Sequence, residues 1–354
     1  MSRMEPMELP HEAVHLFEDA RTGLRAVIAI HSTALGPAAG GCRVWHYAAD
    51  SAATGDALRL SEGMTYKNAM AGLPLGGGKA VIMLPADFDG DRRALFKAFG
   101  RCVESLQGRY VTAEDVGSTV EDMLSVAAAT DHVAGLPQTR SGQAGGDPSP
   151  HTAQGVFLAM QVAAERKFGT PLKDTVVGVQ GLGNVGMALA AKLSHAGAKL
   201  LVSDMNERRV AQAVHMFGAQ QVAPEKIVGA PMDILAPCAM GAIVNHATIG
   251  SIQARIICGA ANNQLETPAR GAELARRGIF YAPDYLVNAG GIISVCAEYL
   301  GESLESVERR VAEIGPRLGR MIDEAERSGE AMNLVADRHA RQIVADGRAR
   351  RKAA

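Results

Sequence analysis

The chain has 354 residues, 47% of them apolar and 21% charged, and its formal net charge is −2. This composition is typical of a folded globular protein, and at about 150 residues per domain the length favours two domains. The near-neutral charge and the 4% aromatic content argue against nucleic-acid binding, which uses basic patches and stacking aromatics. No apolar run is long enough to span a membrane, and residues 1–19 lack the apolar core of a secretory signal.

The cysteines indicate a reducing compartment. Their number is odd, they are far apart, and no CxxC pair occurs, so neither a disulfide framework nor a cysteine zinc site is expected. The ten histidines form no HExxH motif and no cluster at metal spacing, so we expect no metal site. We therefore expect a cytoplasmic protein. The five cysteines are Cys42, Cys102, Cys238, Cys258 and Cys296.

The first third of the chain alternates strand and helix patterns, as in an α/β fold. Four glycine clusters, at 36–41, 76–78, 181–186 and 290–291, suggest loops that converge on one bound molecule, although any single cluster could be a simple turn. The predicted elements of this part are strands at 24–30, 79–84 and 109–111 and helices at 54–70, 92–106 and 121–130.

A second α/β unit follows the segment 140–150, RSGQAGGDPSP, whose glycine, serine and proline content predicts a hinge. The pattern of this unit is a helix followed by alternating short β-branched runs and helices, which indicates parallel βαβ units. The predicted elements are helices at 151–168 and 185–196 and strands at 175–180, 199–203, 233–235, 242–244, 256–258 and 278–280.

The C-terminal region is predicted to be helical. Apolar residues at helical spacing between 307 and 325 predict an amphipathic helix, which Gly315-Pro316 should kink or split because proline lacks a backbone donor. The tail 338–352 carries six Arg or Lys residues. We interpret it as a solvated helix face in preference to a nucleic-acid arm.

A dinucleotide-binding motif opens the second unit. Gly181, Gly183 and Gly186 form a GxGxxG sequence between a β-branched strand and a helix, where glycines allow a tight turn and close approach to a pyrophosphate. Asp204 ends the next strand and could accept hydrogen bonds from a ribose 2′-OH, which favours NAD over NADP. Arg209 and its neighbour Arg208 could instead pair with a 2′-phosphate.

Two lysines and an aspartate form the candidate acid–base group. Lys67 falls in a predicted helix, Lys79 directly follows Gly76–Gly78, and Asp115 follows the predicted strand 109–111. A partly desolvated lysine near a second cation binds its proton less tightly and can act as a base. The alternatives are that both lysines face solvent and that Asp115 caps a helix.

The motifs GPAAGGCR, GMTYKNAMAGLPLGGGK, GRYVTAEDVG, GDPSP, VQGLGNVG, APCAMGAI, GAANNQ and YAPDYLVNAGG resemble those of the glutamate, leucine, phenylalanine and valine dehydrogenases, in the same order from about residue 12 to 345. CRVW, GMTYKNA and TAEDVG are most similar to the leucine dehydrogenase branch. The resemblance implies an α/β fold with an N-terminal catalytic domain, a C-terminal Rossmann NAD-binding domain and a cleft between them. The expected limits are 1–140 with a C-terminal helix at about 331–354 for the first domain, and 145–330 for the second.

The same resemblance implies NAD-dependent, reversible oxidative deamination of an L-amino acid to a 2-oxo acid and ammonia. It makes Lys79 the general base, Asp115 the catalytic aspartate that handles protons, and Lys67 the ligand of the substrate carboxylate. Further implied substrate contacts come from the backbone of Gly40 and Gly41 and from Asn288. The implied cofactor contacts are Gly181, Gly183, Asn184, Val185, Gly186, Asp204, Asn262 and Thr152.

The resemblance also implies an apolar substrate pocket. Family members that use glutamate carry a lysine and a serine where this chain has Ala39 and Val295, and a buried carboxylate there would lack a partner. Ala39 resembles the phenylalanine enzymes, whereas Ala113 resembles the leucine enzymes. We expect leucine, valine or isoleucine as the substrate, with phenylalanine or another aromatic as the alternative. The pocket residues are Ala39, Met64, Ala113, Ile292 and Val295.

Two further expectations concern the partners of the protein and its activity. The family implies a homo-oligomer, a dimer or an octamer, with small molecules as the other partners and neither nucleic acid nor membrane. A catalytically inactive NAD-binding regulator would require the loss of Lys67, Lys79 or Asp115, and all three are present.

Overall fold

The computed structural model describes residues 10–138, 141–239 and 241–353, which divide into two compact units. Unit 1 is the chain up to Gly146 with Glu298–Gly301 and the residues from Ala340 onward, and unit 2 is Asp147–Ala297 with Glu302–His339. The start of the predicted hinge and nearly half of the stretch tested for a secretory signal lie outside the described residues. No described helix is long and apolar enough to cross a membrane.

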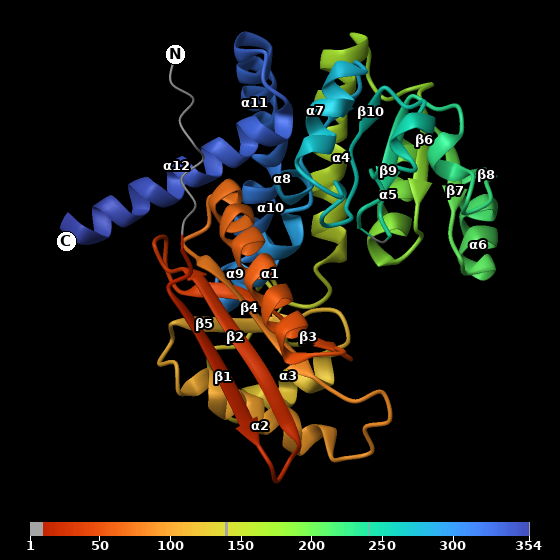
Figure 1. The fold of residues 1–354 in the computed structure, drawn as a ribbon. Helices are drawn as coiled ribbons and strands as arrows, with labels where there is room; N and C mark the ends of the chain where they lie inside the picture. Colours follow the sequence, from red (N-terminus) through yellow and green to blue (C-terminus); the bar gives the residue numbers. More distant parts are fainter. Residues whose placement is uncertain (1–9, 139–140, 240, 354) are drawn as a thin grey trace. The chain divides into compact units, whose positions relative to one another are not determined.

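Unit 1 is built on a five-stranded mixed sheet in the order β1-β2-β4-β3-β5 (Figure 1). The pairs β1–β2 and β2–β4 are antiparallel, whereas β3 pairs parallel with both β4 and β5. The carboxyl ends of β3, β4 and β5 therefore meet at one edge. The strands are β1 (Ala13–Asp19), β2 (Leu24–Ser32), β3 (Ala38–Trp45), β4 (Gly76–Met83) and β5 (Tyr110–Glu114).

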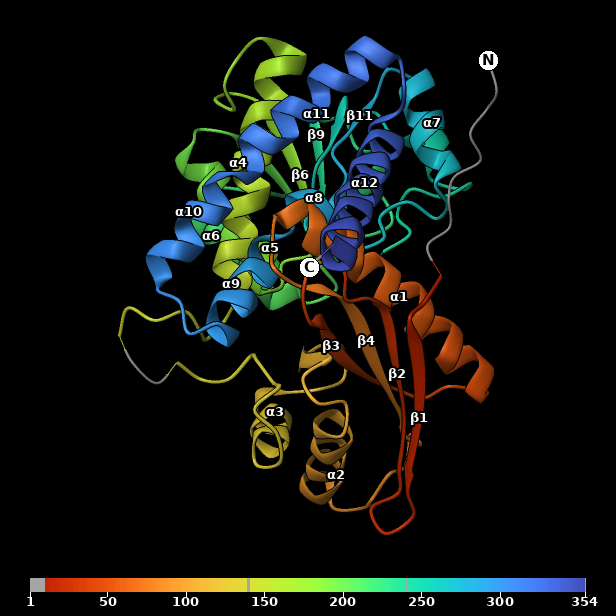
Figure 2. The same cartoon turned by 90° about the vertical axis from the view of Figure 1, so that its left-hand side faces the viewer.

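Helices cover both faces of this sheet, because the buried strands are apolar on both sides. On β2, Ile28 and Ile30 join one core with Phe96 of α2, whereas Val27 packs on the opposite face with Ala57 of α1. Figure 2 shows α2 and α3 together on one side of the sheet and α1 on the other. The helices are α1 (Asp50–Ala71), α2 (Arg92–Glu104) and α3 (Val120–Ala127).

Two of the glycine clusters predicted as loops lie partly or wholly in strands. Gly76–Gly78 open β4, and Gly40 and Gly41 lie inside β3. The physical reason is close packing. A Cβ at Gly76 would lie 1.9 Å from the carbonyl oxygen of Ser32 on the neighbouring β2, and one at Gly40 would lie 1.9 Å from that of Gly78.

Unit 2 contains a six-stranded parallel sheet in the order β11-β10-β9-β6-β7-β8. Counted along the chain this is the 3-2-1-4-5-6 order of a Rossmann fold, with its switch point between β6 and β9. The predicted fold class is confirmed. The strands are β6 (Val176–Gln180), β7 (Lys199–Ser203), β8 (Gln220–Gln221), β9 (Ile234–Pro237), β10 (Ile256–Ile257) and β11 (Phe280–Tyr281).

The helices of unit 2 include the predicted break. Glu313 separates α10 from α11, and Pro316 stands in the first turn of α11, where a missing backbone donor costs little. The helices are α4 (Ser149–Phe168), α5 (Asn184–His195), α6 (Glu207–Phe217), α7 (Ala269–Arg276), α8 (Asp284–Val287), α9 (Gly290–Tyr299), α10 (Leu304–Ala312) and α11 (Ile314–Ser328), and α12 (Met332–Ala353) runs from unit 2 into unit 1.

Two predicted strands of unit 2 differ in the structure. The prediction at 242–244 is wrong: Val244 makes an isolated bridge to Leu265, and Ala242 has a φ of +55°, which interrupts an extended strand. The strand predicted at 278–280 begins later, at Phe280, because Gly278 has a φ of +71° in the turn after α7.

Candidate active site

The candidate acid–base residues lie on the face of the unit 1 sheet that α1 covers. Because side chains alternate along a strand, Lys79 shares a face with Val81, which packs against α1. Arg43 lies on the corresponding face of β3, opposite Val81 in the register of β3 and β4, and bonds to Asp56 of α1. Asp115 follows β5 at the carboxyl edge of the sheet.

Lys79 and Asp115 form a buried ion pair. Lys79 Nζ lies 2.8 Å from Asp115 Oδ2, and the side chains are 5% and 23% exposed. Burial alone would raise the pKa of Asp115, but the positive charges of Lys79 and Arg43 together hold it below its usual value. Asp115 is therefore an ionised carboxylate in a largely desolvated place. The two residues that the sequence predicts as base and acid are in direct contact.

A tight turn fixes the position of Asp115. Ser118 Oγ accepts a hydrogen bond from the Asp115 amide at 2.9 Å and donates to the Cys42 carbonyl of β3 at 2.8 Å. Gly117 has a φ of +81°, and a Cβ there would lie 2.1 Å from the carbonyl oxygen of Val44. The turn after β5 is thus packed directly on β3, which leaves the Asp115 carboxylate little freedom.

Arg43 is a further charged residue of the site that the sequence reasoning missed. Its Nε lies 3.2 Å from Asp115 Oδ2, and its terminal nitrogen lies 2.9 Å from Asp56 Oδ2. Asp56 also accepts hydrogen bonds from Tyr47 at 2.6 Å and Arg59 at 2.7 Å. The available signal was the arginine of the CRVW motif, two residues after Gly41, one of the glycines assigned to substrate binding.

Helix α1 brings Lys67 and Met64 to the same part of unit 1. Asn68 is fully buried and donates to the Gly76 carbonyl at 2.5 Å, which ties the helix to the start of β4. A Cβ at Gly77 would lie 2.1 Å from the Thr65 backbone nitrogen, so only glycine allows this approach. Lys67 is half-buried on this helix, and Met64 Cγ lies 3.1 Å from the position of a Cβ at Gly40.

The predicted residues of β3 and β5 lie side by side. In the register of these strands Gly41 pairs with Ala113 and Ala39 with Val111, and both alanines are buried. A Cβ at Gly41 would lie 2.8 Å from the Cβ of Asp115, so this glycine lets the carboxylate residue pack against the strand. Close packing alone accounts for glycine at this position, beside any backbone contact to a substrate.

In unit 2 the glycine motif forms the expected turn after β6. Gly181 has a φ of +94° and donates to the Ser203 carbonyl at 2.7 Å. A Cβ at Gly186 would lie 1.9 Å from the Gly181 carbonyl oxygen, so the turn tolerates no side chain there. Gly183 precedes Asn184, the first residue of α5, and Val185 follows in the first turn. The N-terminus of α5 carries the partial positive charge that suits a pyrophosphate.

Asp204 directly follows β7 and is tied to this turn. Its Oδ2 accepts a hydrogen bond from the Leu182 amide at 2.6 Å, and its Oδ1 accepts one from the Asn206 amide at 2.7 Å. Arg209 lies over the same turn, with a terminal nitrogen 4.0 Å from the position of a Cβ at Gly183. A cavity of about 480 Å³ beside the turn is lined by Gly183, Asn184 and Arg209, among others.

The two asparagines predicted near substrate and nicotinamide are in contact. Asn288 Nδ2 donates to Asn262 Oδ1 at 2.8 Å, and Asn288 is 2% exposed. The buried Asn288 Oδ1 has no hydrogen-bond partner in the described part of the chain. A Cβ at Gly291 would lie 2.7 Å from Thr152 Oγ1, which places Thr152 against the start of α9.

Ile292 and Val295 are half-buried and three residues apart on α9. They belong to unit 2, whereas Ala39, Met64 and Ala113 belong to unit 1. The five predicted pocket residues therefore fall into two groups, one in each unit.

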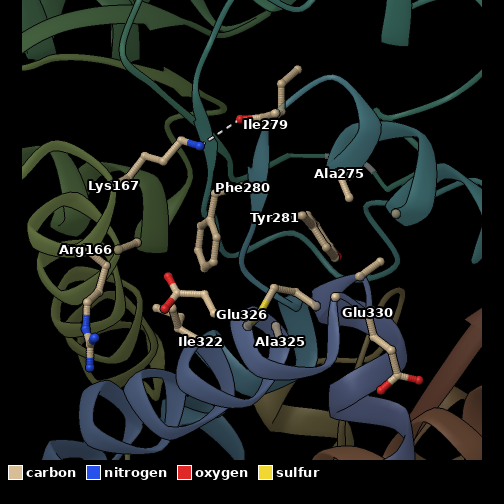
Figure 3. Close-up of a pocket in the computed structure, with 16 residues that line it drawn as sticks. Arg166, Lys167, Ala275, Ile279, Phe280, Tyr281, Ile322, Ala325, Glu326 and Glu330 are labelled. Atoms are coloured by element: carbon tan, nitrogen blue, oxygen red, sulfur yellow. Dashed lines mark hydrogen bonds between the residues drawn. The ribbon is translucent and has the colours of Figure 1, made fainter.

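A further hollow of about 340 Å³ lies in unit 2 between α4, α7, β11 and α11. Its lining is largely apolar, with Phe280, Tyr281 and Ile322 facing it and Glu326 among the charged side chains around it (Figure 3). Lys167 Nζ donates to the Gly278 carbonyl at 2.9 Å beside it. None of the predicted site residues lines this hollow.

Comparison with known proteins decides the family. The model of the Glu/Leu/Phe/Val dehydrogenase dimerisation domain matches residues 11–132, and the model described as glutamate/leucine/phenylalanine/valine dehydrogenase matches residues 200–346. The chain belongs to this family. It is therefore an amino-acid dehydrogenase, and the prediction of an oxidoreductase of this class is confirmed.

Individual relatives cover nearly the whole chain. A leucine dehydrogenase from Bacillus cereus is 47% identical over 341 residues, which is 95% of this chain and 91% of the relative. A valine dehydrogenase from Streptomyces albus is 43% identical, and the match covers 96% of this chain and 94% of the relative. The crystal structure of an L-tryptophan dehydrogenase from Nostoc punctiforme has a TM-score of 0.83 and 39% identity, covering 96% of this chain and 97% of that one.

Proposed function

We propose that the enzyme catalyses NAD-dependent, reversible oxidative deamination of leucine, valine or isoleucine to the 2-oxo acid and ammonia. The observation that carries the proposal is the buried contact of 2.8 Å between Lys79 and Asp115. A lysine and a carboxylate in a place with little water can exchange protons with a substrate amine and with one attacking water. The family membership supplies the reaction class, and this pair supplies the acid–base chemistry.

The residues of unit 2 fit a dinucleotide. The turn leaves no room for a side chain at Gly181 or Gly186, and it leads into the N-terminus of α5. A cavity of about 480 Å³ lies beside it. Gly183, Asn184 and Val185 would hold the pyrophosphate, Asp204 the adenosine ribose, and Asn262 with Thr152 the nicotinamide end. When bound there, a nicotinamide would supply the acceptor for the hydride that leaves the substrate Cα. We propose NAD because a carboxylate at position 204 accepts hydrogen bonds from a 2′-OH and repels a 2′-phosphate.

The acid–base steps belong to unit 1. Lys67 binds the substrate carboxylate, with the backbone of Gly40 and Gly41 and the amide of Asn288 as further contacts. After loss of the hydride the substrate is an iminium ion. Lys79, in its neutral form, takes a proton from a water that adds to the iminium carbon. Asp115, ionised at rest, relays this proton from Lys79 to the amino group, and ammonia leaves. Lys79, neutral again, then receives the hydroxyl proton as the carbonyl forms.

The predicted pocket residues are apolar in each unit. Ala39 and Ala113 are buried, and Met64, Ile292 and Val295 are half-buried. Since none of these side chains can pair with a carboxylate, glutamate is a poor substrate. The small Ala39 is the feature that favours the aromatic alternative, because it deepens the pocket by the volume of a larger side chain.

A substrate panel tests the proposed function. We expect the highest kcat/KM for a branched-chain L-amino acid with NAD, with ammonia, 2-oxo acid and NADH formed in equal amounts. Each methylene is worth about 1–3 kcal/mol of discrimination, so leucine and phenylalanine should differ by a measurable factor. A larger kcat/KM for phenylalanine or tryptophan would replace the branched-chain assignment with the aromatic one. Reduction of NAD without release of ammonia would contradict the proposed deamination.

The cofactor assignment has its own test in Asp204. We expect the wild-type enzyme to prefer NAD, and Asp204→Ser to lower kcat/KM for NAD by about 10–100-fold, the value of a hydrogen bond to a charged group. The same change should raise the relative use of NADP. Glu207→Gln removes a nearby exposed charge and serves as the control, with its cofactor ratio unchanged. A wild-type enzyme that prefers NADP would contradict the role of Asp204.

We further propose a cytoplasmic homo-oligomer, a dimer or an octamer, because the family model over residues 11–132 is that of a dimerisation domain. Strand β1 is at an edge of the unit 1 sheet and exposes Leu16 at 71% and Val14 at 42%. Apolar side chains on an edge strand are typical of a surface that another chain covers. The five cysteines are all free, which suits a reducing compartment.

A further inference from the structure

One oxygen of Asp115 is shared by two cations. Lys79 Nζ lies 2.8 Å and Arg43 Nε 3.2 Å from Asp115 Oδ2. Within the described residues, the hydrogen bonds and ion pairs of this carboxylate all involve Oδ2. The side chain is 23% exposed. The two cations therefore hold one oxygen and leave the other for a reacting group.

The charges of this cluster alternate from Lys79 through Asp115 and Arg43 to Asp56. Arg43 is 22% exposed and Asp56 is 14% exposed, so all four groups interact across a medium that screens less than water. With Lys79 protonated, the four charges sum to zero. When Lys79 is neutral, Arg43 still compensates Asp115, which would otherwise be a carboxylate with no nearby cation in a largely buried place.

We propose that Arg43 is a positioning residue of the deamination reaction, which holds the Asp115 carboxylate by Oδ2 and balances its charge while Lys79 is neutral. This inference rests on the proposed function, since it concerns the proton exchange assigned to Lys79 and Asp115. Arg43 itself acts through Asp115 and has no assigned contact with the substrate.

The geometry requires the planar fork of an arginine. Arg43 donates through Nε to Asp115 and through a terminal nitrogen to Asp56, at 3.2 Å and 2.9 Å. A lysine has a single ammonium group at its end, which can keep the positive charge but cannot reproduce two fixed donors at this spacing. Asp56 is itself held by Tyr47 and Arg59, so the far end of the bridge is fixed.

Two titratable groups of the neighbouring strands, Cys42 and Tyr110, carry no charge that would replace Arg43. Burial raises the pKa of the Cys42 thiol on β3 and that of the Tyr110 hydroxyl on β5, so both are neutral in the working range. Arg59 is bonded to Asp56 at 2.7 Å and is 56% exposed, so solvent screens it. Arg43 is thus the cation, besides Lys79, that is bonded to Asp115 in the described part of unit 1.

The pH profile of kcat distinguishes the effect of the Arg43 charge from the effect of its two fixed hydrogen bonds. Loss of a cation beside the acid–base pair makes the pair easier to protonate, so Arg43→Gln should move the acidic limb of the profile to higher pH by about one unit and lower kcat by about tenfold. Arg43→Lys keeps the charge, so its limb should stay in place while kcat falls. Asp56→Asn removes a negative charge from the far side of Arg43, so its limb should move to lower pH.

Controls make the test independent of folding and of the proposed function. Arg93→Gln removes an exposed cation of α2 that is not part of this network, and it should change kcat by less than about twofold. The midpoint of thermal unfolding is measured for every variant. If wild-type enzyme fails to deaminate any branched-chain amino acid, the proposed function fails. If wild-type enzyme is active and the folded Arg43→Gln variant has the same acidic limb and a kcat within about twofold of it, this inference is wrong. If Arg43→Gln does not fold, the other two variants decide. An unshifted limb with a lower kcat in Arg43→Lys and a limb at lower pH in Asp56→Asn support the inference. A kcat of Arg43→Lys within about twofold of wild type and an unshifted limb in Asp56→Asn overturn it.

Discussion

We expect the Lys79→Ala variant to lose about 10²–10⁴-fold in kcat for deamination, the range that positioned acid–base groups contribute. Lys79 is 4% exposed and contacts Asp115. Water from the solvent therefore cannot readily replace it as the base. Arg43 still compensates Asp115 in this variant, so the fold should survive. The measurement is steady-state NADH formation with saturating leucine, together with the midpoint of thermal unfolding.

The matched control for this change is Lys97→Ala, since Lys97 is an exposed lysine on α2 in the same unit. Its kcat should stay within about twofold of wild type, because exposed substitutions have small effects. Near-normal turnover in Lys79→Ala, with the control unchanged, would remove Lys79 from its role as the base.

The second large effect is expected for Gly77→Ala. The added methyl carbon would lie 2.1 Å from both the backbone nitrogen and Oγ1 of Thr65, so α1 must move away from β4. Overpacking of this kind costs about 1–3 kcal/mol, and a clash with backbone belongs at the upper end. Because α1 carries Lys67, we also expect KM for the amino acid to rise. Thermal unfolding and the substrate dependence of the rate measure the two effects.

Gly55→Ala is the control that should have the opposite sign. Gly55 lies in the exposed part of α1, and a Cβ there would meet no atom within 4 Å. Glycine in a helix is less favourable than alanine by about 1 kcal/mol, so this variant should be more stable than wild type with unchanged KM. If Gly77→Ala is as stable as Gly55→Ala, the close approach of α1 and β4 is not as described.

Local sequence patterns were sufficient for much of the fold. The β-branched run before Gly181, the GxGxxG turn and the helix after it gave the βαβ unit, because strand, turn and helix each have a signal within a few residues. The proline at 316 likewise indicated the break between α10 and α11. These features depend on neighbours in the chain, which a sequence displays directly.

Features that depend on distant neighbours were missed. Gly76–Gly78 were predicted as a loop, because the approach of Ser32, Thr65 and Tyr110 that demands glycine in a strand comes from other elements. Ala242 was predicted inside a strand, although its φ of +55° excludes one. The hydrophobic periodicity and the amino-acid composition of a segment carry no information on such tertiary constraints.

The candidate site shows the same division. Lys79 and Asp115 were predicted from motifs, and the structure brings them into contact, while their catalytic roles stay predictions. Arg43 was missed because its significance arises only from the meeting of β3, the turn after β5 and α1. The domain limits and the assignments of the cofactor-binding residues also stay predictions, which the experiments on Asp204 and Lys79 address in part.

The most direct test is the pre-steady-state time course of NADH formation by Lys79→Ala with leucine. Hydride transfer precedes the addition of water, and Lys79 is assigned to the later step. We therefore expect a rapid burst of NADH, stoichiometric with enzyme subunits, followed by slow turnover. A slow time course without a burst would show that hydride transfer itself has failed, and would contradict the assignment of Lys79 to the water.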